Sequence, residues 1–226
     1  MTRNAPSTLA AVCSSATLGT LDAELWLEPH ALKRWRRFRH RRDRDGFLVA
    51  RVLTAILWGR LRGRDPDTCC FQQTCSECGG PHGRPRIVGE TELWPSWSHS
   101  GDLVAAIVGP APVAIDIETN THAIPVDITG PGTAAERQER WSLAECWTKA
   151  GYTDLGSALD HIRRGTTPPC PLPNTCTVTI THSRGYRNPD PTNHPKLRGS
   201  RLAGLSCCPA TLRPTSRTSS QIPDIG

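Results

Sequence analysis

Two acidic residues stand close together in the stretch PVAIDIET, residues 112–119. Valine and isoleucine alternate along it, which predicts a buried strand. In a strand, positions two apart point to the same face, so Asp116 and Glu118 should leave the sheet side by side. Carboxylates that close raise one another's pKa unless a cation lies between them. The spacing therefore indicates either a cation site or an ordinary solvated strand face.

A third carboxylate and a lysine follow in a stretch with helical character. Glu145 and Lys149 are four residues apart, so on a helix they share a face. Taken alone, they would be a surface ion pair of small energy. Together with Asp116 and Glu118, Glu145 would complete an oxygen-only site for Mg²⁺, which keeps several waters and bridges substrate phosphates. The chemistry expected of such a site is the handling of a diphosphate.

Three elements must position these residues. Residues 31–61 carry apolar side chains at helical spacing, with Gly46 as the expected break or bend. A turn at residues 100–102 precedes an expected strand at 103–108. Residues 133–152 predict a second helix, which opens with a threonine cap candidate and acids in its first turn.

The composition is that of a soluble protein with a hydrophobic core. Of 226 residues, 37% are hydrophobic and 21% charged, and no apolar run reaches the ~20 residues of a membrane span. Residues 1–19 are interpreted as a ragged start and not a secretory signal. We therefore expect a cytoplasmic protein whose ten cysteines are thiols. The net charge of +6, concentrated in KRWRRFRHRRDR (33–44), indicates an anionic partner.

Composition also suggests the boundaries of the parts. We expect an N-terminal part over 1–110, a second part with the acidic motifs over 111–165, and a tail over 166–226. Half of the 20 prolines follow Thr167, and only residues 176–183 of the tail resemble a strand. The tail is expected to be disordered or incompletely folded. Its composition is also that of an out-of-frame translation of GC-rich DNA.

Five segments in order resemble one enzyme family. VAIDIE (113–118) followed by WSLAECWTK (141–149) resembles the signature pair of Sfp-type 4'-phosphopantetheinyl transferases, of the holo-acyl-carrier-protein synthase superfamily. The basic stretch 34–57 resembles the family's first long helix. HGRP (82–85) and WSHSGDLVAAIV (97–108) resemble its G-[KR]-P turn and its Ser-His-Ser strand.

The resemblance implies a fold. It is an α/β (α+β) protein of two similar, pseudo-symmetric subdomains, each a small, mostly antiparallel sheet packed with a long helix. The halves would join near residues 109–112, with the active site in the cleft between them.

The resemblance also implies residue roles. The metal ligands would be Asp116, Glu118 and Glu145. Coenzyme A would be bound by Arg34, Arg84, Ser98 and His99. The catalytic residues would be Glu145, which takes the proton directly or through a water, and Lys149, which stabilises the transferred charge.

The implied reaction is a Mg²⁺-dependent transfer of phosphopantetheine from coenzyme A. A serine of an acyl or peptidyl carrier protein attacks the phosphorus, and 3',5'-ADP leaves. Such an enzyme would serve fatty acid, polyketide or nonribosomal peptide biosynthesis. We expect a monomer without nucleic-acid or membrane partners, whose basic first helix helps to steer acidic carrier proteins.

Two departures from the family pattern are visible. Ala144 stands where the family usually has a lysine, which would remove a cation beside the site, and Ala114 replaces a glycine before the acidic strand. A catalytically impaired remnant of such a transferase is therefore an alternative.

Two further alternatives come from other classes. KRWRRFRHRR, with Trp35 and Phe38 between its basic residues, also suits a nucleic-acid-binding protein that stacks bases. A small zinc module is suggested by cysteines and a histidine at ligand-like spacing. Its candidate ligands are Cys69, Cys70, Cys75, Cys78 and His82.

Overall fold

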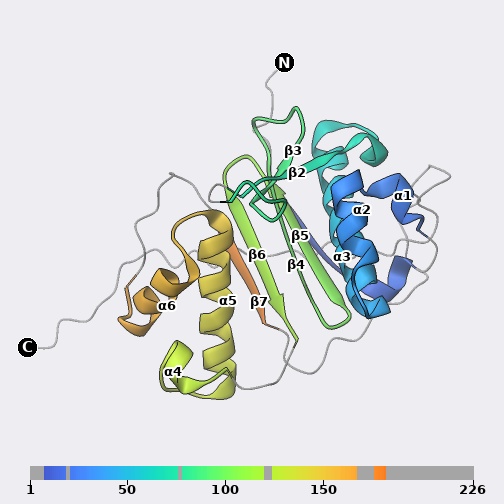
Figure 1. Cartoon of the computed structure of the whole chain (residues 1–226). Helices are drawn as coiled ribbons and strands as arrows, with labels where there is room; N and C mark the ends of the chain where they lie inside the picture. The colour runs from blue at the N-terminus through green and yellow to red at the C-terminus, as the bar shows by residue number, and fades with distance from the viewer. Residues whose placement is uncertain (1–7, 19–20, 76–77, 120–123, 167–175, 182–226) are drawn as a thin grey trace, which may run out of the picture.

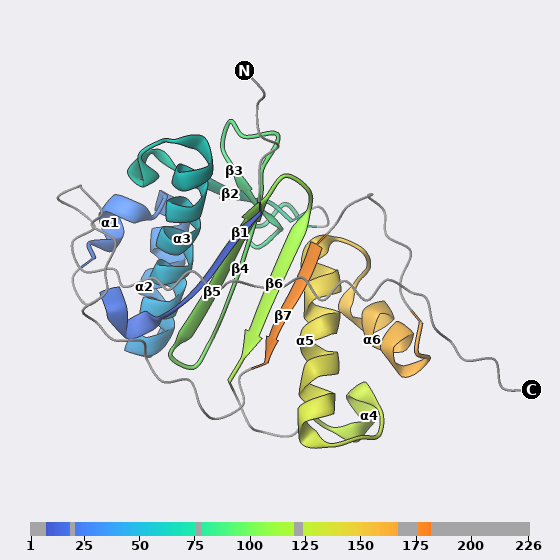
Figure 2. The same cartoon turned by 180° about the vertical axis from the view of Figure 1, so that it is seen from behind.

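The chain folds into mixed α and β structure with small sheets flanked by helices. The computed structural model describes residues 8–18, 21–75, 78–119, 124–166 and 176–181. Five strands lie side by side in the order β1, β5, β4, β6, β7 (Figure 1 and, from behind, Figure 2). Helix α3 packs on β5, β4 and β1, and α5 packs on β6 and β7.

The first three strands form an antiparallel sheet in the order β1-β5-β4. The bounds are β1 Leu9–Ser14, β4 Trp94–Ser100 and β5 Leu103–Gly109. A turn with Gly101 at φ 61° joins β4 to β5, as the sequence predicts. The helices on this side are α1 (Ala23–Trp26), α2 (Pro29–Arg36) and α3 (Arg41–Arg62).

A short hairpin lies between α3 and β4. Strands β2 (Phe71–Gln73) and β3 (Pro85–Ile87) pair antiparallel. Two 3₁₀ turns, at Ser15–Leu18 and Pro66–Thr68, complete this part.

The described residues of the second part form one strand pair and three helices. Strands β6 (Val113–Glu118) and β7 (Cys176–Thr181) pair in parallel. The helices are α4 (Val126–Thr129), α5 (Ala134–Ala150) and α6 (Leu155–Arg163). The predicted second helix is confirmed as α5, and Thr133 caps it in a capping box with Glu136.

Strand β5 is buried on both faces, which explains its continuous apolar sequence. Val104, Ala106 and Val108 belong to the core around α3. The alternate residues Ala105 and Ile107 pack with the valine and isoleucines of β6. The other face of β6, which carries Asp116, is turned toward α5, because Ala114 packs against Cys146 and Ala150 of that helix.

Three expectations from the sequence are wrong. Gly46 does not break the helix, which is interrupted instead at residues 37–40; Gly46 lies inside α3. A Cβ there would lie 3.2 Å from His99 Cγ, so the glycine makes room for that ring. Residues 9–14 of the supposed ragged start form β1, whose alternate residues Ala11 and Cys13 are buried.

The third correction concerns the strands of the second part. The sheet there was expected to be mostly antiparallel, but the pair β6–β7 is parallel. The predicted strand in the tail is confirmed as β7. The remaining tail was expected to be disordered or a product of a frame error. Apart from Thr166, its residues lie outside the described part of the chain.

No helix in the described ranges combines the length and the apolar character needed to cross a membrane.

Candidate active site

Serine side chains join β4 to β6. Alternate residues of a strand point the same way, and SWSHS (96–100) places a serine at every second position of β4. Ser96 Oγ accepts a hydrogen bond from the Ile115 amide at 3.3 Å. Ser98 Oγ donates to Asp116 Oδ1 at 2.8 Å, and Ser100 Oγ donates to Glu118 Oε1 at 2.5 Å. The serines therefore hold both carboxylates of β6 in fixed orientations.

Lys149 of α5 meets this row from the other side. Its Nζ lies 2.6 Å from Asp116 Oδ1 and 3.3 Å from Ser98 Oγ. Glu145 Oε2, one turn earlier on the same helix, lies 4.0 Å from the same ammonium. Glu145 and Lys149 of α5 therefore lie beside the acidic strand, and the direct ion pair between Lys149 and Asp116 was not predicted from the sequence. The Asp116 side chain is 8% exposed and Lys149 29%, so this ion pair is largely shielded from water.

Among the described residues, the three carboxylates of this site are balanced by only one neighbouring ammonium, that of Lys149. Burial raises the pKa of Glu145; Lys149 opposes this, while the negative charges of Asp116 and Glu118 add to it. The oxygens of the three acids do not all lie within 4.8 Å of one another. The site is thus a loose acidic group with excess negative charge, compensated in part by Lys149.

A cavity of about 290 Å³ lies next to Lys149 and has a basic lining. Its cationic or titratable lining residues are Arg34, Arg51, His82, His99 and Lys149. Phe47, Gln73, Trp97 and Ser98 complete the wall. The predicted residues Arg34, Ser98, His99 and Lys149 thus come together from α2, β4 and α5. Such a lining suits an anionic group.

Arg51 is a member of this lining that sequence reasoning missed. It is 3% exposed, and its guanidinium lies between the rings of Phe47 (3.6 Å) and Trp97 (4.9 Å). It donates hydrogen bonds to the Phe47 carbonyl and to Gln73 Oε1, at 3.0 and 2.9 Å. Burial lowers the pKa of Arg51 to about 9, still above neutrality, so the group remains a cation. The one available signal was a lone arginine inside the apolar run of α3.

His99 sits in a cationic environment. The residue is exposed, yet the surrounding protein removes enough water from the ring to lower its pKa. Asp43 opposes this effect, whereas Lys149, Arg51 and Arg34 add to it. The neutral ring is therefore favoured until an anion enters the cavity.

Arg84 is not brought to the cavity. Its guanidinium donates to the Ala150 carbonyl at 2.9 Å and to the Val113 carbonyl at 3.5 Å, and it lies over the Trp94 ring at 4.8 Å. Burial lowers its pKa. Arg84 therefore ties the turn before β3 to α5 and β6, and its role in coenzyme A binding stays a prediction.

The two alanines that depart from the family pattern are both fully buried. Ala144 packs with Trp147, Ala158 and Leu159, in the cluster between α5 and α6. Adjacent helix positions do not share a face, so this position does not point with Glu145 toward the carboxylates. A lysine at position 144 would therefore not point toward the carboxylates, and Ala144 removes no cation from beside them. Ala114 lies within the regular strand β6, where a positive φ is not required.

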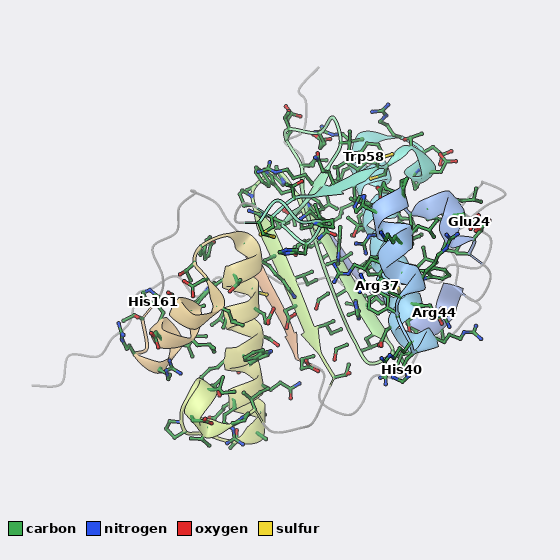
Figure 3. All side chains as sticks on the ribbon, viewed as in Figure 1. Glu24, Arg37, His40, Arg44, Trp58 and His161 are labelled. Atoms are coloured by element: carbon green, nitrogen blue, oxygen red, sulfur yellow. The ribbon has the colours of Figure 1, made fainter. Side chains whose placement is uncertain are left out.

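The basic segment around α2 does not display its aromatic residues as a stacking surface. The Trp35 indole donates to the Arg44 carbonyl at 3.0 Å, and Phe38 packs on Phe47 with centroids 5.3 Å apart. Arg37, His40 and Arg44 lie around the α2–α3 junction, away from α5 (Figure 3). Basic charge is therefore exposed here, while both aromatic side chains pack on the first core.

Of the candidate zinc ligands, the structure brings together only some. Cys75, Cys78 and His82 are the one group of potential metal ligands that converges within the described ranges. Cys69 is buried and Cys70 exposed, and both lie outside this group.

Comparison with models of known protein families found no match, and a search of curated proteins found none either.

Proposed function

We propose that this chain transfers 4'-phosphopantetheine from coenzyme A to a serine of an acyl or peptidyl carrier protein. The observation that carries the proposal is the position of Lys149. Its ammonium pairs with Asp116 and also lines the basic cavity. A diphosphate at Lys149 would have carboxylates for a divalent cation on one side and cationic side chains for a further phosphate on the other.

The donor set suits Mg²⁺. Asp116, Glu118 and Glu145 offer only oxygens, the ligands that this hard cation prefers. The pKa of Glu145 is raised partly by the charges of the other two acids, and a bound cation would relieve that repulsion. Asp116, Glu118 and Glu145 would hold the ion, which when bound would neutralise charge on the diphosphate.

The cavity would hold one phosphate-bearing end of coenzyme A. Its volume of about 290 Å³ lies just below the ~300–1,000 Å³ of ligand pockets, so it suits part of a large ligand. Arg34, Arg51 and His99 would bind the 3'-phosphate there through charge-assisted hydrogen bonds. Ser98 would keep its bond to Asp116, and thus connect the two halves of the site.

The chain's own residues have distinct roles in the reaction. The carrier serine oxygen forms a bond to the phosphorus that bears pantetheine, and the bond from that phosphorus to the 3',5'-ADP oxygen breaks. Glu145 would accept the serine proton, directly or through a water. Lys149 stabilises the negative charge that develops on the transferred group.

The same proposal includes the architecture and the partner. The chain would consist of two pseudo-symmetric parts, one with α3 against the first sheet and one with α5 against β6 and β7, and would act as a cytoplasmic monomer. Exposed basic residues at the α2–α3 junction, among them Arg37 (Figure 3), would attract an acidic carrier protein.

The test is a transfer assay with an apo carrier protein, coenzyme A and Mg²⁺, read by intact-mass spectrometry. We expect one phosphopantetheine per carrier, abolished by EDTA and reduced by about a hundredfold or more in Glu118→Gln, which keeps the shape of the side chain. Glu139→Gln, an exposed change on α5, is the matched control and should leave the rate unchanged. Equal rates for the two variants would contradict the assignment of the acidic group.

A further inference from the structure

A second group of potential ligands lies in the connection between β2 and β3, apart from the carboxylates. The thiols of Cys75 and Cys78 and a ring nitrogen of His82 all lie within 4.8 Å of one another. Cys78 Sγ is 2.9 Å from His82 Nε2. Neither Cys75 nor Cys78 is part of a disulfide.

The backbone around these residues brings the ligands together. The Cys75 amide donates to the Gly80 carbonyl at 2.8 Å, and the Gly79 amide donates to the Cys75 carbonyl at 2.9 Å. Gly79, directly after Cys78, has φ 69°, a conformation that glycine adopts without strain. The Gly80 amide donates to Cys78 Sγ at 3.4 Å, which helps to fix the position of that sulfur.

We propose that Cys75, Cys78 and His82 bind one zinc ion, with the fourth tetrahedral position taken by water or an external ligand. Two thiolates and an imidazole form the soft donor set that selects zinc over Mg²⁺. Zinc–ligand bonds of ~2.0–2.3 Å at tetrahedral angles place ligand atoms about 3.3–3.8 Å apart. Binding therefore requires small adjustments. Cys78 Sγ and His82 Nε2, now 2.9 Å apart, must separate slightly, and any pair of ligand atoms near the 4.8 Å limit must move closer together.

Zinc binding here is coupled to protonation. The ligands are two thiolates and a neutral imidazole, so binding to the thiol form releases two protons for each zinc ion bound.

The zinc would fix one wall of the basic cavity, because His82 belongs to its lining. Gly83, which follows His82, is already fixed in position. Its carbonyl accepts a hydrogen bond from Gln73 Nε2 at 2.9 Å, and a Cβ on Gly83 would collide with the Thr74 carbonyl. Gln73 in turn accepts a hydrogen bond from Arg51. The ion would thus have a structural role, and the inference stands independently of the proposed transferase activity.

The test uses the full chain, purified, stripped with a chelator and reconstituted with zinc chloride or cobalt chloride. We expect about one zinc per chain by elemental analysis, and with cobalt the sulfur-to-cobalt charge-transfer absorption of a tetrahedral thiolate site. Cys78→Ser should retain less than about a tenth of the zinc, whereas Cys70→Ser, at an exposed cysteine outside the group, should retain all of it.

His82→Asn provides a second variant if Cys78→Ser does not fold, and it should weaken zinc binding while leaving both thiols in place. The proposal is overturned if the wild-type chain takes up no zinc and gives no charge-transfer band with cobalt. It is equally overturned if Cys70→Ser loses as much zinc as Cys78→Ser, or if Cys75 and Cys78 form a disulfide that excludes the metal under reducing conditions.

Discussion

The ion pair between Asp116 and Lys149 is the contact on which the candidate active site most depends, and its strength can be measured. The perturbation is a double-mutant cycle of Asp116→Asn, Lys149→Met and the double variant. Asparagine keeps the shape that hydrogen-bonds Ser98, and methionine keeps the apolar stem of the lysine. Each single change removes one charge, and the cycle isolates the interaction between them.

The magnitude follows from burial and distance. A hydrogen bond to a charged group contributes ~1.5–3 kcal/mol to stability. The separation of 2.6 Å and the 8% exposure of Asp116 favour a substantial value, while the 29% exposure of Lys149 favours the lower half of that range. We expect a coupling of about 2 kcal/mol. The exposed pair Arg41–Asp45, with side chains 77% and 35% exposed, should give only about 0.3–0.5 kcal/mol.

The assay is urea unfolding of the four chains in EDTA, so that no divalent cation contributes. The Arg41–Asp45 cycle, measured in the same way, is the control. A coupling of less than about 0.5 kcal/mol for Asp116–Lys149 would refute the reasoning, because Lys149 would then not be held against the acidic strand.

Two further predictions concern the carboxylate and the cavity. Because burial raises the pKa of Glu145, the folded metal-free chain binds that proton more readily than the unfolded chain, so stability should fall as pH rises from about 4.3 through the raised value. Urea midpoints of Glu145→Gln should lack this contribution, and those of Glu139→Gln should retain it; identical pH profiles for the two would exclude the effect. Arg51→Met should weaken binding of 3',5'-ADP about tenfold by calorimetry, because it removes a cation from the cavity. Arg60→Met, on the exposed face of the same helix, should leave affinity unchanged, and equal losses would show a general charge effect.

Local rules decide on which faces the residues of the acidic group lie. Strand alternation places Asp116 and Glu118 on one face, and helical spacing pairs Glu145 with Lys149. The capping box at Thr133 sets the start of α5. These are short-range patterns, so they are readable without knowledge of the fold.

The features that sequence reasoning missed depend on contacts between distant segments. Strand β1 contains two alanines, a cysteine and a serine among its six residues, and its pairing with β5 stabilises it more than local propensity does. Arg51 appears in sequence as a charge within an apolar helix, and only the approach of Trp97 and Gln73 shows its place in the cavity. Gly46 has the residue type of a helix break, but it lies within the helix because the His99 ring leaves no room there for a side chain.

The most direct test of the proposed function is to measure two products in one reaction of the wild-type chain with coenzyme A and an apo carrier protein. The mass gain of the carrier and the 3',5'-ADP released should appear in equal amounts with Mg²⁺, and both should vanish with EDTA. Release of 3',5'-ADP without mass gain would show hydrolysis and not transfer. A folded chain that produces neither with Mg²⁺ would contradict the proposal.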